Sequence, residues 1–123
     1  MLSRRFFLLL LLLSAGSCAY DNAEELLERN PPPVCEDVAV TYSGIISPLL
    51  DQHCRSCHNR QDRQGNIDLD GHQAAKRYAD NGLLVGVTSH ALGFEPMPKN
   101  AAKLSDCDLS RIRKWVAAGA PDN

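Results

Sequence analysis

Apolar residues after residue 40 of this 123-residue chain recur at the three- and four-residue spacing that buries one face of a helix. Three stretches show this spacing: residues 44–53, 71–79 and 106–118. A shorter apolar run, residues 83–87, fits either a short strand or a buried loop. Polar segments with Gly and Pro separate these stretches. The pattern therefore predicts an all-α domain of three or more helices.

Residue types at the ends of these stretches support the same assignment. Ser105 and Asp108 have the spacing of a capping box, and Gly119 follows the last helix, as a C-terminal stop signal does. Asp70 and Gln73 predict a similar cap for the helix over residues 71–79. Both helices are therefore expected to begin at a polar side chain.

The N-terminus has a different pattern, typical of an export signal. Arg4 and Arg5 precede an unbroken apolar run, residues 6–13, and small residues follow at positions 14–17. The run is too short to span a bilayer, which needs about 20 residues. It also lacks the polar face of an ordinary surface helix. Residues 1–17 are therefore expected to be a signal peptide, and the protein to be exported.

Cys18 follows the small residues directly, in a segment that resembles a bacterial lipobox, with Ala15 at the position where a large aliphatic residue is usual. The resemblance implies that Cys18 is lipidated and holds the mature protein on a membrane. The alternative is cleavage nearby, which leaves Cys18 as a free thiol or disulfide partner. Residues 18–40, with three consecutive prolines, are expected to be a linker. The folded domain is expected over residues 41–123.

The charge balance excludes one class of partner. The chain has 13 Lys and Arg against 15 Asp and Glu, and loss of residues 1–17 would leave 11 basic residues against all 15 acidic ones. A nucleic-acid-binding domain needs a basic face. We therefore expect no nucleic acid partner.

The segment Cys54-Arg55-Ser56-Cys57-His58 carries the candidate chemistry. Two thiols at this spacing can add to the two vinyl groups along one haem edge, and His58 then lies beneath the iron as a ligand. The other nitrogen of its ring is expected to donate to a backbone carbonyl. Half a zinc site, a redox dithiol and a structural disulfide are the alternatives, but the dithiol and disulfide interpretations leave His58 unexplained. The motif predicts one covalent haem (heme c) with its iron.

A second iron ligand is expected further along the chain. Met97 is the only methionine after Met1, and a proline on each side restricts its backbone. His90 and His72 are the alternatives. Coordination by His58 and Met97 would leave no open position on the iron, so that electron transfer is the chemistry that remains.

Residues 42–121 resemble class I c-type cytochromes. The resemblance rests on the haem motif, on Pro96-Met97-Pro98 and on a last helix with Trp115, and it extends to the single-haem domains of bacterial exported lipoproteins. It implies a small cytochrome c-like fold around one haem, with the first and last helices crossing where Trp115 packs. If they cross, Cys35 and Cys107 could meet, and we expect a disulfide; the alternative is two buried thiols.

These features together predict an electron carrier rather than an enzyme. It would lie on the periplasmic or cell-surface side of a bacterial membrane and exchange electrons with redox partner proteins. One alternative is a haem-containing subunit or sensor whose iron binds a gas or peroxide because Met97 is not a ligand. Another is a non-haem module with a Cys54–Cys57 disulfide.

Overall fold

The computed structural model describes residues 35–36 and 38–123, which belong to one compact unit. The proposed signal peptide, Cys18 and the linker up to residue 34 lie outside the described residues. Within the described part of the chain every regular element is helical, so the predicted all-α class is confirmed. None of these helices has both the length and the apolar character needed to cross a bilayer.

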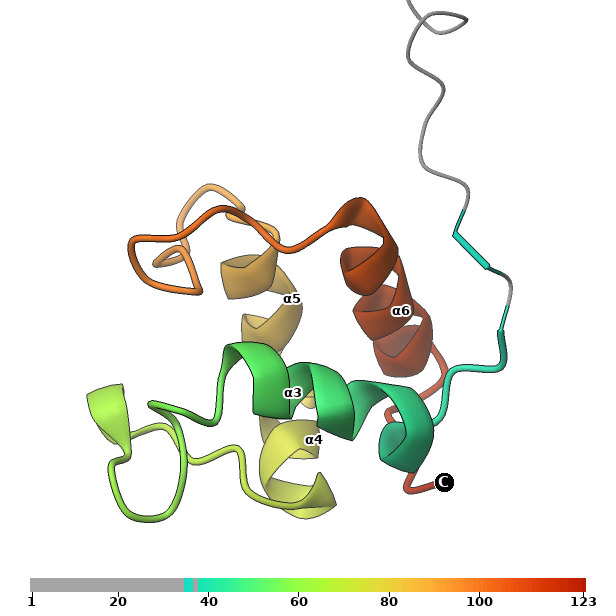
Figure 1. Ribbon diagram of the computed structural model, residues 1–123, viewed down its shortest axis with the longest axis horizontal. Coiled ribbons are helices and arrows are strands. Elements are labelled where there is room, and N and C mark those ends of the chain that lie inside the picture. The colour runs from blue at the N-terminus through green and yellow to red at the C-terminus, as the bar shows by residue number, and fades with distance from the viewer. Residues whose placement is uncertain (1–34, 37) are drawn as a thin grey trace, which may run out of the picture. The chain divides into compact units, whose positions relative to one another are not determined.

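Figure 1 shows the order of the elements along the chain. They are the π-helical turn η1 (Tyr42–Ile46), α3 (Ser47–His53), the 3₁₀ turn η2 (Gln64–Asn66), α4 (His72–Asp80), α5 (Leu83–Thr88) and α6 (Asp106–Ala117). The three predicted helices correspond to η1 with α3, to α4 and to α6. Residues 83–88 form a helix, so the expectation of a strand or loop there was wrong.

The first helix begins two residues earlier than the apolar pattern indicated, because polar groups satisfy its exposed N–H groups. The Thr41 hydroxyl accepts a hydrogen bond from Gly44 N at 3.1 Å. Tyr42 N donates to Asn123 Oδ1 at 2.8 Å, and Ser43 N donates to Asn123 O at 2.9 Å. The C-terminal residue therefore caps the first helix.

The predicted caps of the other helices had different outcomes. Ser105 Oγ accepts from Asp108 N at 3.1 Å, as expected for the start of α6. Asp70 does not cap α4: Gly71, with a φ of 81°, occupies the N-cap position, and Asp70 Oδ2 accepts from Arg60 N at 3.0 Å. Its carboxylate therefore holds the segment before α4 rather than the helix itself.

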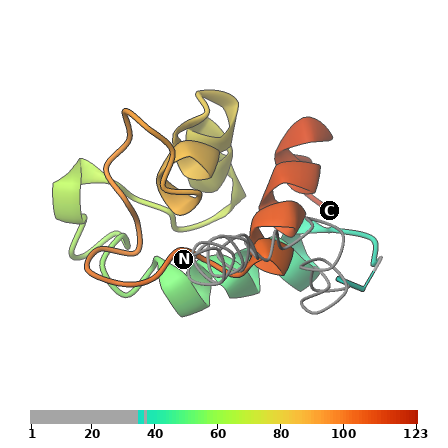
Figure 2. The same cartoon turned by 90° about the horizontal axis from the view of Figure 1, so that it is seen from above.

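The core lies where η1 and α3 meet α6. Trp115 and Tyr42 are both buried, with ring centroids 5.7 Å apart, and Trp115 Nε1 donates to Pro121 O at 2.9 Å. Figures 1 and 2 show η1 and α3 as one continuous helical rod that α6 crosses near its η1 end. The other large buried apolar residues are Ile46, Leu49, Leu50, Leu69, Leu84, Leu104, Leu109 and Ile112.

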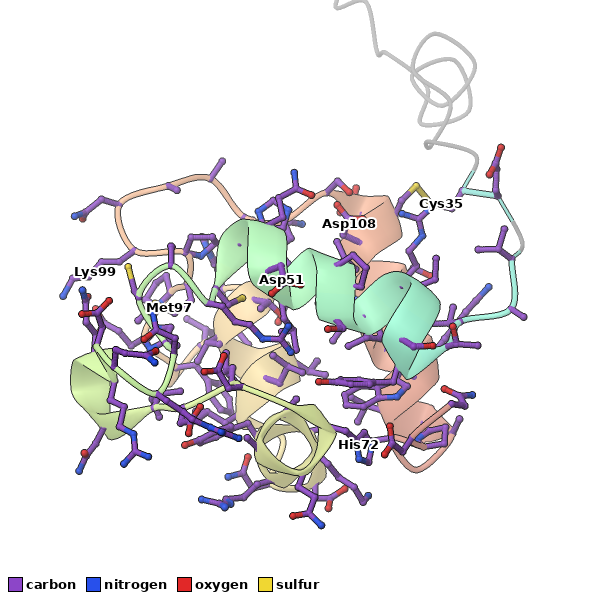
Figure 3. All side chains as sticks on the ribbon, turned by 60° about the horizontal axis from the view of Figure 1, so that its bottom comes forward. Cys35, Asp51, His72, Met97, Lys99 and Asp108 are labelled. Atoms are coloured by element: carbon purple, nitrogen blue, oxygen red, sulfur yellow. A yellow bond between two sulfur atoms is a disulfide. The ribbon has the colours of Figure 1, made fainter. Side chains whose placement is uncertain are left out.

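A disulfide joins Cys35 to Cys107 in the first turn of α6, with the two Cα atoms 5.3 Å apart. The two residues are therefore bonded rather than two separate buried thiols. This bond attaches the chain to the helical domain from Cys35 onward, ahead of the expected boundary at residue 41. Figure 3 shows Cys35 at the opposite end of the domain from Met97.

Candidate haem-binding site

The two cysteines and His58 lie on one hydrogen-bonded turn that begins where α3 ends. Cys54 N donates to Leu50 O at 2.9 Å, which closes the last turn of the helix. Cys57 N and His58 N then both donate to Cys54 O, at 3.1 and 3.0 Å. The rigid end of α3 therefore positions all three side chains that the motif singled out.

The loop after His58 folds back and fixes the imidazole. Gln64 N donates to Cys57 O at 3.0 Å, and Leu69 N donates to His58 O at 2.9 Å. Gly65 and its neighbours allow this tight path, since Arg63, Gly65 and Asn66 all have positive φ values.

The ring of His58 makes the hydrogen bond that the sequence analysis expected. His58 Nδ1 lies 2.9 Å from Gln64 O. A carbonyl oxygen only accepts, so Nδ1 carries the proton and donates. In the neutral ring the lone pair is then on Nε2. In metal sites, the histidine nitrogen that does not bind the metal donates a hydrogen bond of this kind, which fixes the orientation of the ring.

Both thiols of the motif are free, although the same chain forms a disulfide elsewhere. Cys54 packs against the hydrophobic core, and this burial raises the pKa of its thiol to about 11, although the charge of Arg55 acts in the opposite direction. A thiol with so high a pKa is protonated at neutral pH and is a poor nucleophile or thiolate ligand. A neutral thioether suits this apolar position.

These observations disfavour the alternatives for the motif. A reactive redox dithiol needs a depressed thiol pKa, and a structural disulfide needs a bond between the two sulfurs. A structural zinc site needs four ligands, whereas the motif itself supplies only two cysteines and His58. The residues present therefore fit covalent haem better than they fit these other uses.

Met97 is fixed by both of its backbone polar groups. Met97 N donates to Val87 O at 3.0 Å, and Met97 O lies 3.1 Å from His90 Nε2. The peptide bond between Met97 and Pro98 is cis. The side chain is half-buried, and its loop lies at the same end of the domain as the segment that follows α3 (Figures 1 and 2). The thioether is thus held on a short, anchored loop.

The two alternative histidines are engaged elsewhere. His90 donates through Nε2 to the Met97 carbonyl and thereby holds the loop. His72 Nε2 lies 2.8 Å from Ala120 O, and its ring packs edge-on against Tyr42 and Trp115. His72 is therefore part of the core near the C-terminus (Figure 3).

Sequence reasoning missed Arg55, which stands between the two cysteines. Arg55 Nε donates to Leu69 O at 2.8 Å, Nη1 donates to Asp51 Oδ1 at 2.8 Å, and Nη2 donates to Tyr42 Oη at 3.0 Å. No sequence signal indicated this role, because positions between the cysteines of such a motif serve as spacers.

Comparison with family models, with curated proteins and with solved structures finds no match for this chain. The function must therefore be argued from the residues of the site.

Proposed function

We propose that this protein is a monohaem c-type cytochrome that carries single electrons outside the cytoplasm. The observation that carries the proposal is the hydrogen bond from His58 Nδ1 to Gln64 O, on the turn that also holds two free thiols. That bond leaves Nε2 as the nitrogen for a metal.

Four side chains would hold the cofactor. Cys54 and Cys57 would form its thioether links, His58 would be one iron ligand and Met97 the other. When bound, haem c supplies a one-electron couple between ferric and ferrous iron. The protein's part is to orient the imidazole through Gln64, to hold the thioether through Val87 and His90, and to hold Cys54 against the hydrophobic core.

The remaining features support a place outside the cytoplasm. A disulfide such as Cys35–Cys107 persists in oxidising compartments. The sequence of residues 1–17 fits export, and Cys18 fits a lipid anchor, so we propose a tethered carrier on a bacterial membrane. Its partners would be exported or membrane-bound redox proteins that reach it within the length of the linker.

An absorption spectrum of the purified, exported protein tests the proposal. The reduced protein should show the spectrum of a low-spin c-type haem that remains with the polypeptide after denaturation. The same spectrum should not change with carbon monoxide, because Met97 would occupy the sixth position. Met97→Ala should become high-spin and bind carbon monoxide, while Cys54→Ala/Cys57→Ala should be colourless.

Other outcomes select the alternatives. Binding of carbon monoxide to the unaltered protein, with an unchanged Met97→Ala spectrum, would favour a gas- or peroxide-binding subunit or sensor. A colourless protein after correct export, with a Cys54–Cys57 disulfide in a peptide map, would refute the haem proposal altogether.

A further inference from the structure

The side chain of Arg55 is the most extensively bonded one in the attachment segment. Its guanidinium donates to Leu69 O, to Asp51 Oδ1 and to Tyr42 Oη, as described above. Nη1 also donates to Ser47 Oγ at 2.9 Å. These partners come from η1, from α3 and from the segment before α4. Arg55 therefore links both flanks of the turn that holds Cys54, Cys57 and His58.

The link to Leu69 bears directly on the imidazole. Leu69 donates its N–H to His58 O, while Leu69 O accepts from Arg55 Nε. The two ends of the segment from Arg55 to Leu69 are thus held together around His58. A planar guanidinium suits this task because its donors are fixed in a fork, whereas a lysine ammonium presents one point charge.

The charge of Arg55 is more deeply buried than the charges of its acidic partners. Its side chain is 13% exposed, while its closest acidic partner, Asp51, is 63% exposed. A second carboxylate oxygen, Asp70 Oδ1, lies 3.9 Å from Nε. Water screens Asp51 much more than it screens the cation, because screening is weaker for buried charges. The cation is therefore the least screened charge of this group.

Burial opposes the charge of Arg55, but its hydrogen bonds to Asp51 and Tyr42 outweigh this effect and keep its pKa above the ordinary value. The guanidinium is therefore charged throughout the ordinary pH range. A nearby cation disfavours the more positive of two oxidation states. Ferric iron carries one more positive charge than ferrous iron, so Arg55 would favour reduction of a haem held by this turn.

We infer that Arg55 is a positioning residue that clamps the haem-attachment turn between α3 and Leu69, and that its charge raises the reduction potential of the site. The claim about the reduction potential rests on the proposed function. The claim that Arg55 clamps the turn concerns the chain itself and applies to the haem-free protein as well.

Charge and geometry are separated by two substitutions at this position. Arg55→Gln removes the charge, and Arg55→Lys keeps the charge but loses the fork. Arg63→Gln is the matched control, because Arg63 lies in the following loop, is 56% exposed and pairs with Asp68 at 3.6 Å. Asp51→Asn removes the partner carboxylate from an exposed position and should leave the fold intact.

The midpoint potential of each purified holoprotein should be measured by redox titration. Arg55→Gln should lower the potential by more than Arg63→Gln does, Arg55→Lys should keep it closer to the unaltered value, and Asp51→Asn should raise it. Equal shifts in Arg55→Gln and Arg63→Gln, or a lower potential in Asp51→Asn, would overturn the role of the charge. If Arg55→Gln yields no holoprotein, the Asp51→Asn variant still tests the role of the charge. A higher potential in that variant would support the role, and a lower potential would overturn it.

Denaturant unfolding of the haem-free chains tests the clamp. Both substitutions at Arg55 should lower the unfolding midpoint, while Arg63→Gln should leave it unchanged. An unchanged midpoint in Arg55→Lys would overturn the clamp. A colourless unaltered protein would instead refute the proposed function, and this unfolding experiment would still report on the clamp.

Discussion

Gly86 in α5 offers a test in which two opposing effects can be compared in size. A Cβ placed on Gly86 would lie 2.5 Å from both Cδ1 and Cε1 of the Phe94 ring and 2.7 Å from its Cγ. Ordinary contacts of this kind are about 1 Å longer. The ring of Phe94 therefore lies directly on the backbone of α5, and Gly86→Ala would force it away.

The sign of the expected change in the free energy of unfolding follows from two effects of known size. In an open helix interior, replacing Gly by Ala stabilises by about 1 kcal/mol. Inserting a methyl group into an occupied space costs about 1–3 kcal/mol. Gly86→Ala should therefore destabilise by roughly 0–2 kcal/mol, which is the difference between the two. Phe94 is 39% exposed, so part of the cost can be relieved by outward movement of the ring.

The same substitution should reverse sign once the ring is removed. In a Phe94→Ala background the ring no longer occupies this position, and Gly86→Ala should then stabilise by about 1 kcal/mol. Equilibrium unfolding in urea, with all four proteins in the same oxidation state, measures this cycle. A coupling energy of about 1–3 kcal/mol is expected between the two positions.

The result that would refute the reasoning is equal stabilisation by Gly86→Ala in both backgrounds. That outcome would mean that Phe94 does not rest on α5. If the protein binds haem as proposed, a second measurement is available, because Phe94 and Met97 share a loop that is bonded to Val87. Gly86→Ala alone should weaken the spectral signature of Met97 ligation.

Two further predictions concern the cysteines. Cys35→Ser/Cys107→Ser opens a loop with a sequence separation of 72 residues and should lower the free energy of unfolding by about 4 kcal/mol in the chain-entropy model. Reductant should lower the stability of the unaltered protein in the same way and leave the double variant unchanged. In the haem-free protein, burial raises the Cys54 thiol pKa from about 9 to about 11, so the unfolded chain loses this proton at lower pH than the folded one. Stability should therefore be intact below pH 9 and fall as the pH rises towards 11, and a Cys54→Ala variant should lack this component; an unchanged slope in that variant would contradict the assignment.

Periodicity was enough to predict most of the helices, but their ends depended on contacts that a sequence pattern does not contain. The start of η1 is extended by Asn123, which lies at the other end of the chain. The run at residues 83–87 was ambiguous because short apolar stretches do not show a clear period. Asp70 had the spacing of a cap, but the backbone of Arg60 competes for its carboxylate.

Some features of the candidate site could be predicted from the sequence, and others could not. The spacing of Cys54, Cys57 and His58 was visible in the sequence, and so was the isolated Met97. The carbonyl that receives His58 Nδ1 was not, since it depends on a loop that turns through Arg63 and Gly65 at positive φ. The contacts of Arg55 were equally hidden, because its partners are spread from Tyr42 to Leu69.

The bond between Cys35 and Cys107 also determines how the domain responds to mechanical force. A pull on the chain from the N-terminal side of Cys35 passes through a covalent bond into the first turn of α6. Because Cys35 and Met97 lie at opposite ends of the domain (Figure 3), tension on the tether would reach the buried helices before it reached the loop that holds the thioether.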